Sequence, residues 1–440
     1  MSGPLSRPIP VQGESRQGYL LRLSGSNALD SPRRLKAEWL DVLAPRAVLR
    51  GPIAGLGVLN ASDPAGPSAR YWNTRRPRYC PHCLEEAPHW RSVWSLVFYV
   101  ACHRHGVALV DDCSECGCPL RWVRQHLLRC PCGADLRDRA PKIASAHSVS
   151  ASRALAAAWR DGESPCERPI ADVDVEGLLY RTWLLGSYRS QAAERAQKLV
   201  GLHAVPQAVR IVEAAADVLS GGKSGYFDFL DQVAARYGDE SSTRLARRFG
   251  AFYKELFATK AGAALAELRE GFEAYVRERW PGQIAERNRR LSQEVRTGHA
   301  WIPVTRAAKQ LHWSSARLRD ATARGAVQGR LHQRPSGRVT GVVHREDLER
   351  LKADSSTWID LTGTCRLLRI GKKAANALIG SGRLPAVSGP SIDGRVVWQF
   401  RRADVERIQL QECGREGPQD LLDMTPPASG SRSRVVDNRR

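Results

Sequence analysis

The amino-acid sequence predicts a mostly α-helical protein built from several domains. Three observations support this class: a dense group of Cys and His residues between positions 80 and 132, a long Ala-, Leu- and Arg-rich stretch with helical periodicity, and a repeat near the C-terminus. At 440 residues the chain is long enough for two to four domains with hydrophobic cores.

The chain is strongly basic. Its 67 Lys and Arg residues outnumber 46 Asp and Glu residues, which gives a formal net charge of +21. Because the hydrophobic content of 42% is ordinary for a globular protein, this charge points to nucleic acid as the partner. No apolar run approaches the ~18 residues of a membrane span, and the N-terminus lacks the apolar core of a secretion signal. We therefore expect a protein of the bacterial cytoplasm, associated with the nucleoid.

The first predicted element is a small N-terminal helical unit, residues 1–69. After a Pro-, Gly- and Ser-rich start, the segment from Glu14 to Leu23 places leucines on one side and predicts a packed helix. A second Pro-, Gly- and Ser-rich passage near residues 60–68 ends the unit.

The second element, residues 70–140, holds eight candidate metal ligands. A Cys-x-x-Cys turn presents two thiolates together, and two such turns make the tetrahedral cage that Zn²⁺ prefers. Taken in sequence order, the residues give two cages: Cys80, Cys83, Cys102 and His105, then Cys113, Cys116, Cys130 and Cys132. Side chains fill all four positions of each cage, so we predict two structural zinc ions per chain and a double zinc-ribbon region.

Several alternatives remain open within this assignment. The last cysteine pair is one residue shorter than the usual turn, His103 competes with His105, and Cys118 competes with Cys116. Gly117 favours Cys116, because glycine allows the turn in which backbone amides approach the sulfur. A disulfide framework is the other interpretation, but paired Cys-x-x-Cys turns without a signal peptide suit a reducing compartment better.

The same stretch carries the motifs of a known family. They are Glu14-Ser15 with the following helix, Tyr79-Cys-Pro-His-Cys-Leu-Glu-Glu86, Trp90-Arg91 with Trp94, Cys102-His-Arg-His-Gly-Val-Ala-Leu109, Asp112-Cys-Ser-Glu-Cys-Gly-Cys-Pro-Leu120, and Cys130-Pro-Cys-Gly-Ala-Asp-Leu136. This pattern, over roughly residues 8–140, resembles the TniQ family. The resemblance implies a transposition protein that selects the target site beside a separate DDE-type transposase and an AAA+ ATPase. In some transposons it also implies attachment to an RNA-guided CRISPR complex.

The third element, residues 141–296, predicts an all-helical domain. Its aromatic residues recur at spacings of three and four, so we interpret them as core and not as base-stacking platforms: Trp183, Phe249, Phe252, Phe257, Phe272 and Tyr275. Gly221-Gly-Lys-Ser224 copies the end of a phosphate-binding P-loop, but Asp217 stands where that motif needs a glycine. We therefore predict no nucleotide site here.

The last elements are two copies of one unit, predicted as residues 297–353 and 354–412. Residues 301–351 recur at 358–408 with a constant offset of 57, and the identical pairs include Trp301/Trp358, Thr305/Thr362, Gly325/Gly382 and Asp347/Asp404. In each copy, a capped helix, a turn, a second helix and a glycine-tipped hairpin predict a winged helix. Both copies resemble the winged-helix domains of excisionases and MerR-type regulators. A disordered basic tail is expected for residues 413–440.

The repeat region is the predicted DNA-binding part. Residues 301–410 contain 20 Lys and Arg against 9 Asp and Glu, a net +11. The second helix of each copy would enter the major groove, and wing arginines would reach phosphate. The candidate contacts are Ser315, Arg317, Arg319, Lys372, Lys373 and Asn376 on the helices and Arg338 and Arg395 on the wings. Any one of them is alternatively a solvated surface charge.

We thus expect a non-enzymatic adaptor with zinc ribbons, a helical domain and two tandem winged-helix (helix-turn-helix) domains. It would bind double-stranded DNA, select a transposon insertion site and recruit the AAA+ ATPase through exposed residues such as Glu85, Glu86, His89 and Arg91. One alternative is a zinc-containing winged-helix transcription regulator, and another is an adaptor to an RNA-guided CRISPR complex without its own DNA reading. A nuclease or transposase would need paired carboxylates around an open metal site, a pattern the sequence does not offer. A homo-oligomer is left open.

Overall fold

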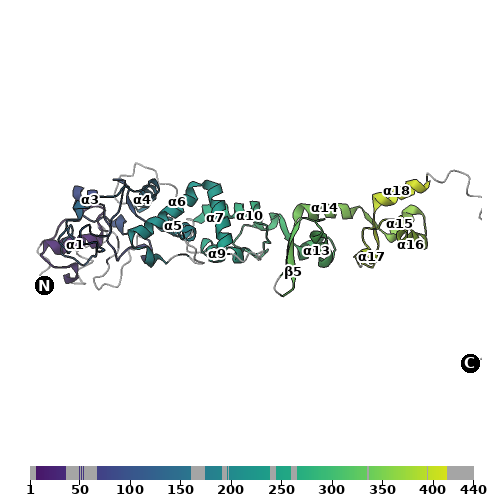
Figure 1. Ribbon diagram of the computed structural model, residues 1–440, viewed down its shortest axis with the longest axis horizontal. Helices are drawn as coiled ribbons and strands as arrows, with labels where there is room; N and C mark the ends of the chain where they lie inside the picture. The colour runs from purple at the N-terminus through teal and green to yellow at the C-terminus, as the bar shows by residue number, and fades with distance from the viewer. Residues whose placement is uncertain are drawn as a thin grey trace, which may run out of the picture. The chain divides into compact units, whose positions relative to one another are not determined.

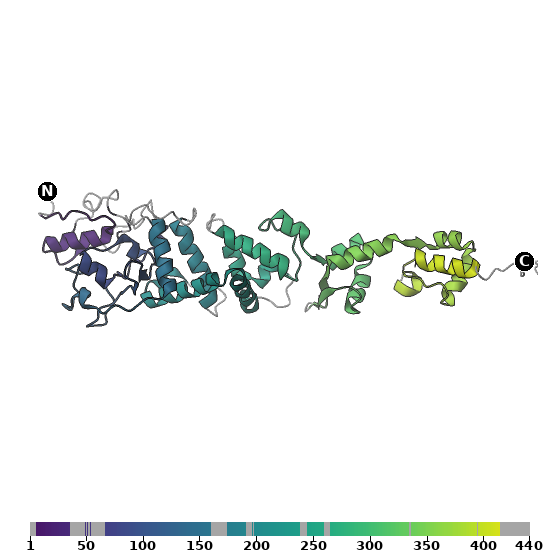
Figure 2. The same cartoon turned by 90° about the horizontal axis from the view of Figure 1, so that it is seen from above.

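The computed structural model describes residues 6–35, 49, 51, 53, 67–159, 174–190, 196, 198–237, 244–258, 265–333, 336–393 and 395–413. The chain forms two compact units, Met1–His299 and Ala300–Arg440. Most of the described residues lie in helices, with a few short strands (Figures 1 and 2). The predicted tail beyond residue 413 lies outside the described residues. No helix in the described ranges is long and apolar enough to cross a membrane.

Unit 1 begins with helix α1, Arg16–Ser26, which corresponds to the helix predicted from Glu14. The hydroxyl of Ser15 caps it by accepting from the Gly18 amide at 2.9 Å. Glu14 is fully buried and pairs with Arg22 at 2.6 Å. The backbone of Ser15 also bonds to the carbonyl of Trp90, so α1 is joined to the cysteine-rich region. Short 3-10 turns follow at Pro32–Arg34 and Ala69–Tyr71.

The cysteine-rich region has little regular structure. It contains helix α3 (Pro81–Glu86), the turns Ser92–Ser95 and Leu136–Asp138, and the antiparallel pair β1 (Ala101–Cys102) and β2 (Val107–Ala108). Elements this short need support from elsewhere, because isolated short helices and two-stranded sheets are marginal in water.

Helices dominate the rest of unit 1. They are α4 (Ala146–Trp159), α5 (Val175–Ser190), α6 (Val205–Ser220), α7 (Gly222–Tyr237), α8 (Leu245–Arg248), α9 (Gly250–Leu256), α10 (Ala266–Glu278) and α11 (Gln293–Gly298), with a 3-10 turn at Leu199–Leu202. The aromatic residues pack against one another as expected for a core, with the Phe249 and Phe272 rings 5.0 Å apart. Gly221 joins α6 to α7, so the Gly221–Ser224 segment follows a helix and not a strand, and Lys223 pairs with Glu278 at 2.7 Å.

One hydrophobic core runs through unit 1 from Leu21 to Val295 and does not divide at residue 140. Trp159 of α4 donates its indole N–H to Ser92 at 2.8 Å. The fully buried Arg78 donates to the carbonyls of Val97 at 2.6 Å and His203 at 2.9 Å. Burial lowers the pKa of Arg78 to about 10, so its guanidinium stays charged at neutral pH and joins the cysteine-rich region to the helices.

Unit 2 contains the two repeats. The first consists of β3 (Trp301–Pro303), α12 (Val304–Gln310), α13 (Ser315–Ala323), β4 (Gly329–Gln333), β5 (Val339–His344) and α14 (Arg345–Ser356). Its antiparallel sheet has the order β3-β5-β4. The helices cover this sheet around a small core of their own.

The second repeat consists of β6 (Trp358–Asp360), α15 (Leu361–Leu368), α16 (Lys372–Gly380), α17 (Pro390–Asp393), β7 (Gln399–Arg401) and α18 (Arg402–Cys413). Helices α15, α16 and α18 begin 57 residues after α12, α13 and α14. The turn between the first two helices contains a left-handed residue in both copies, His312 with φ 54° and Arg369 with φ 55°. Local backbone geometry therefore repeats along with the sequence.

The two repeats differ at the hairpin. The first forms the paired strands β4 and β5, as predicted. In the second, the described residues of this region show an isolated bridge between Ser388 and Gln399 and the short helix α17. The carboxylate of Asp393 accepts from the Gly389 and Arg395 amides, which folds the segment back on itself. The regular hairpin predicted for the second copy is therefore wrong for its described residues.

Candidate metal centres and candidate nucleic-acid surface

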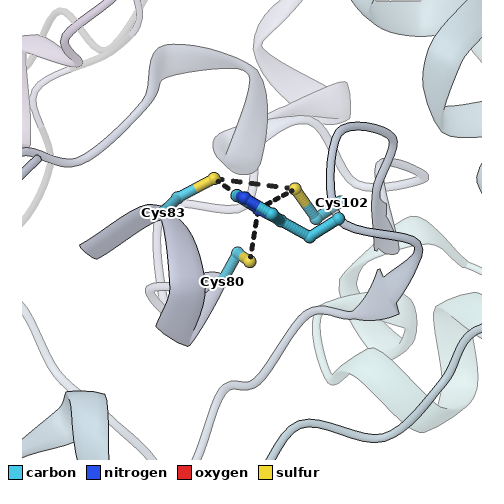
Figure 3. A group of neighbouring side chains, drawn as sticks. Cys80, Cys83 and Cys102 are labelled. Carbon is cyan, nitrogen blue, oxygen red and sulfur yellow. Dashed lines mark hydrogen bonds between the residues drawn. The ribbon is translucent and has the colours of Figure 1, made fainter. Parts of the chain in front are cut away.

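The first candidate centre collects ligands from three local structures. Cys80 precedes α3, Cys83 lies in its first turn, Cys102 ends β1 and His105 lies in the turn that follows. Figure 3 shows the three cysteine side chains converging on one point. The Nδ1 atom of His105 lies 3.5, 3.3 and 3.4 Å from the sulfurs of Cys80, Cys83 and Cys102. All three cysteines are buried and His105 is half-buried.

These separations fit a tetrahedral zinc ion. Bonds of about 2.3 Å to sulfur and about 2.05 Å to nitrogen place two sulfurs about 3.8 Å apart and a sulfur and a nitrogen about 3.5 Å apart. The Cys83 and Cys102 sulfurs are 3.6 Å apart, and the three sulfur–nitrogen distances above lie close to the expected edge. The group can therefore hold a metal ion and is consistent with zinc.

The histidine of this group is held from its other side. The Nε2 atom of His105 lies 2.8 Å from a carboxylate oxygen of Glu86, and this contact holds the pKa of Glu86 below its usual value. A carboxylate in this position fixes the tautomer and the orientation of a metal-binding imidazole. His103 instead bonds to the Tyr99 hydroxyl at 2.7 Å, so the structure favours His105 in the choice left open by the sequence.

The second candidate centre brings together Cys113, Cys116, Cys130 and Cys132, with ligand atoms all within 4.8 Å of one another. Sulfur separations of 3.6 Å for Cys113–Cys132 and 3.8 Å for Cys116–Cys130 again match a tetrahedral edge. Cys116 and Cys132 are exposed, in contrast to the first centre. Burial opposes ionisation of Cys113, but backbone amides of its turn together with the thiols of Cys130 and Cys132 lower its pKa to about 7.

Glycines in left-handed conformation close three of the four ligand turns. Gly106, Gly117 and Gly133 follow His105, Cys116 and Cys132 directly, with φ values of 67°, 65° and 96°. A Cβ at any of the three would meet open space, so the backbone angle and not crowding requires glycine. The role predicted for Gly117 agrees with this geometry.

The disulfide interpretation does not fit the structure. The closest sulfur pairs lie 3.6 Å apart, far beyond the bond length of about 2.05 Å, and the nine cysteines whose side chains the structure describes are free. Cys118 is exposed and lies outside both groups, so the chosen ligand Cys116 keeps its place.

The chain thus combines two groups of four Cys and His residues that can each hold a metal ion with a large excess of basic residues. The comparison with protein families is more specific. Residues 61–109 match the TniQ family model, a range that includes the first candidate centre. Over these residues the chain is similar to the TniQ family, and the resemblance predicted from its motifs is confirmed there. No curated protein matches the chain.

The predicted DNA contacts fall into three groups. Lys372, Lys373 and Asn376 of α16 and Arg338 of the first hairpin are exposed. Ser315 and Arg319 of α13 are half-buried, as is Arg395, which donates to Gln399 at 3.3 Å. Arg317 differs from all of these, because its guanidinium is engaged by Asp393 of the second repeat at 2.7 Å.

Two sequence interpretations need correction. Arg317 does not offer a free guanidinium to DNA, because an acid of the neighbouring repeat already binds it. His89 is buried and not exposed, because the chain turns inward at the fully buried Trp90. Burial and the nearby Arg91, Arg22 and Arg104 lower the pKa of His89 to about 4. It is therefore not part of an exposed contact surface.

Other residues in this region were missed at the sequence level. The contact between Glu86 and His105 joins residues 19 apart, and no spacing rule points to it. The exposed Arg366 and Arg369 were overlooked, although the sequence gives a signal for them: residues 361–392 contain no Asp or Glu.

Proposed function

We propose that this protein is a transposition adaptor that binds double-stranded DNA and helps to choose the insertion site. The observation that carries the proposal is the TniQ match over the first metal centre. The basic repeat region adds a partner class, since its net +11 favours a polyanion. We further propose that the protein itself performs no chemistry and that zinc fills both centres.

The arrangement of unit 1 supports an adaptor role. In both candidate centres the four ligands are protein side chains, so a bound metal has no position left for a reacting water or substrate. The metals would instead shape a surface that includes the exposed Glu85 and Glu86. We propose that this surface recruits the AAA+ ATPase and that the winged-helix-like repeats of unit 2 contact DNA.

The direct test is an insertion assay in cells. A transposon is supplied with its transposase and ATPase, with or without this protein, and insertion sites are mapped by sequencing. We expect insertions at the preferred site to fall sharply when the protein is omitted. An unchanged insertion profile would overturn the proposal, and altered transcription as the sole effect would favour the regulator interpretation.

The division of labour is tested by co-purification. We divide the chain into two fragments at residue 299, because the hydrophobic core of unit 1 includes residues on both sides of residue 140. We expect the ATPase to co-purify with residues 1–299 and with the full chain. Retention by residues 300–440 alone would show that the assignment of the two units is reversed.

A further inference from the structure

An arginine of the first repeat is held by the second repeat. Arg317, on α13, lies 2.7 Å from the carboxylate of Asp393, and the two side chains are only 13% and 8% exposed. Its guanidinium also lies 3.4 Å from both the Ser388 hydroxyl and the Val387 carbonyl, and 3.8 Å over the ring of Trp313. Charge-assisted bonds of this kind fix geometry more strongly than neutral ones.

Hydrogen bonds within the second repeat hold the carboxylate of Asp393 in place. Asp393 accepts from the Gly389 amide at 2.9 Å and from the Ser388 hydroxyl at 2.8 Å. Burial opposes its ionisation, but these donors together with Arg317 hold the pKa of Asp393 below its usual value. Since arginine is always protonated in proteins, the pair is ionic at neutral pH.

The connection between the repeats is short. Helix α14 ends at Ser356 and β6 begins at Trp358, so Thr357 alone joins them. The carbonyl of Thr357 also accepts from the Arg402 amide at 3.1 Å. A connection of one residue leaves the two repeats little freedom to move relative to each other. The Arg317–Asp393 pair restricts this movement further.

The pair has no counterpart at the 57-residue offset. Arg317 corresponds to Ala374, which is exposed on α16, and Asp393 corresponds to Ser336. Residues 387–393 of the second repeat therefore cover a part of α13 whose equivalent on α16 is open. Helices α13 and α16 therefore occupy equivalent positions in the two repeats, but they differ in how accessible they are.

Four exposed cations lie between the last turn of α15 and the first turn of α16, and we call them the second-repeat cluster: Arg366, Arg369, Lys372 and Lys373. No ion pair of these four side chains is found among the described residues. Lys372 and Lys373 also occupy the first turn of α16, where the helix dipole disfavours cations. Uncompensated positive charge of this kind is complementary to a polyanion.

We propose that the two repeats bind duplex DNA as one rigid body, with the second-repeat cluster as the main phosphate contact and Arg317 as a positioning residue between the repeats. This inference rests on the proposed function, which supplies DNA as the partner. A rigid tandem binds better than a flexible one because less freedom is lost on association.

The cluster is tested in the full-length protein by fluorescence anisotropy with a mixed-sequence duplex at several salt concentrations. Lys372→Ala/Lys373→Ala should lower the slope of log affinity against log salt by about 1.8, since each lost phosphate contact removes about 0.9. The matched control, Lys309→Ala/Arg324→Ala, removes two exposed cations of the first repeat and should change the slope much less. Equal effects would overturn the assignment of the main contact to the second repeat.

The role of Arg317 is tested by substituting its partner, Asp393. Removing an acid normally strengthens DNA binding, but Asp393→Asn should weaken it at least about tenfold, because the repeats lose their fixed arrangement. Arg317→Ala should weaken binding similarly, and the double variant should add little. If Asp393→Asn strengthens binding while Arg317→Ala weakens it, Arg317 contacts DNA directly and the positioning role is overturned.

An exchanged pair guards against simple misfolding. Arg317→Asp combined with Asp393→Arg should recover most of the affinity lost in Arg317→Asp alone, which mere surface charge would not produce. Failure of recovery in a folded exchanged variant contradicts the inference. If the full-length protein binds duplex DNA but its variants do not behave as expected, the inference about the repeats is overturned and the proposed function stands. If the full-length protein binds no duplex DNA, both are overturned.

Discussion

The two candidate metal centres have the same number of ligands but different surroundings. The first has three buried cysteines and a histidine supported by Glu86, and it belongs to the region that α4 and Arg78 join to the helical core. The second has two exposed cysteines on turns closed by glycines. Equal numbers of ligands therefore do not mean equal burial: Cys113 and Cys130 of the second group lie in the same hydrophobic core as the cysteines of the first, but Cys116 and Cys132 are exposed.

Removing one ligand from each centre should give the largest contrast. We expect Cys83→Ser and Cys132→Ser each to lower the zinc content from two to one, measured by elemental analysis. Because structural zinc contributes on the order of 10 kcal/mol to folding of small units, loss at the buried centre should destabilise unit 1 severely. Loss at the exposed centre should shift the urea midpoint much less. Equal shifts would show that the difference in burial has no energetic meaning.

The support given by Glu86 allows a finer test of the first centre. Glu86→Gln keeps the size of the side chain but removes the charge that orients His105, so zinc affinity of this centre should fall about 10- to 100-fold. Competition with a chromophoric chelator measures this affinity. Glu85→Gln removes a neighbouring exposed acid whose carboxylate lies 4.0 Å from His82, and it should leave the affinity unchanged. A similar loss of zinc affinity in both variants would show that Glu86 acts only through its surface charge and not through its contact with His105.

Acid should also distinguish the surroundings of the two candidate centres, with a smaller effect on stability. The pKa of His89 is about 4 in the folded state and about 6.5 when unfolded, so the folded state binds fewer protons between these values. Its contribution to stability is complete above pH 6.5 and is lost as pH falls towards 4. His89→Gln should flatten this dependence in denaturation midpoints, whereas His126→Gln, an exposed residue near the second centre, should not. Zinc content measured at each pH separates this effect from metal loss.

The sequence allowed the local chemistry to be predicted better than the packing. All eight ligands were grouped as the structure groups them, because spacing within a turn decides which thiols meet. The repeat gave the helix positions of unit 2, because the same residues recur at a constant offset. Both predictions depend on short-range patterns, which a single sequence contains.

What was missed depends on contacts between distant residues. Arg317 was assigned to DNA because it lies on the second helix of a repeat, but Asp393, 76 positions away, binds it. The core that crosses residue 140 is likewise invisible to composition, since Arg78 reaches His203 over 125 residues. Such pairings arise from tertiary structure, and spacing rules contain no information about them.

The single residue between α14 and β6 has a consequence for protein engineering. With only Thr357 available, the repeats cannot be separated, exchanged or respaced one at a time without disturbing both. A chimera that transfers the proposed DNA-binding region to another protein should therefore be joined near residue 299 and carry both repeats together. The same joint makes an inserted residue at position 357 a direct way to alter the geometry with which the two repeats meet their partner.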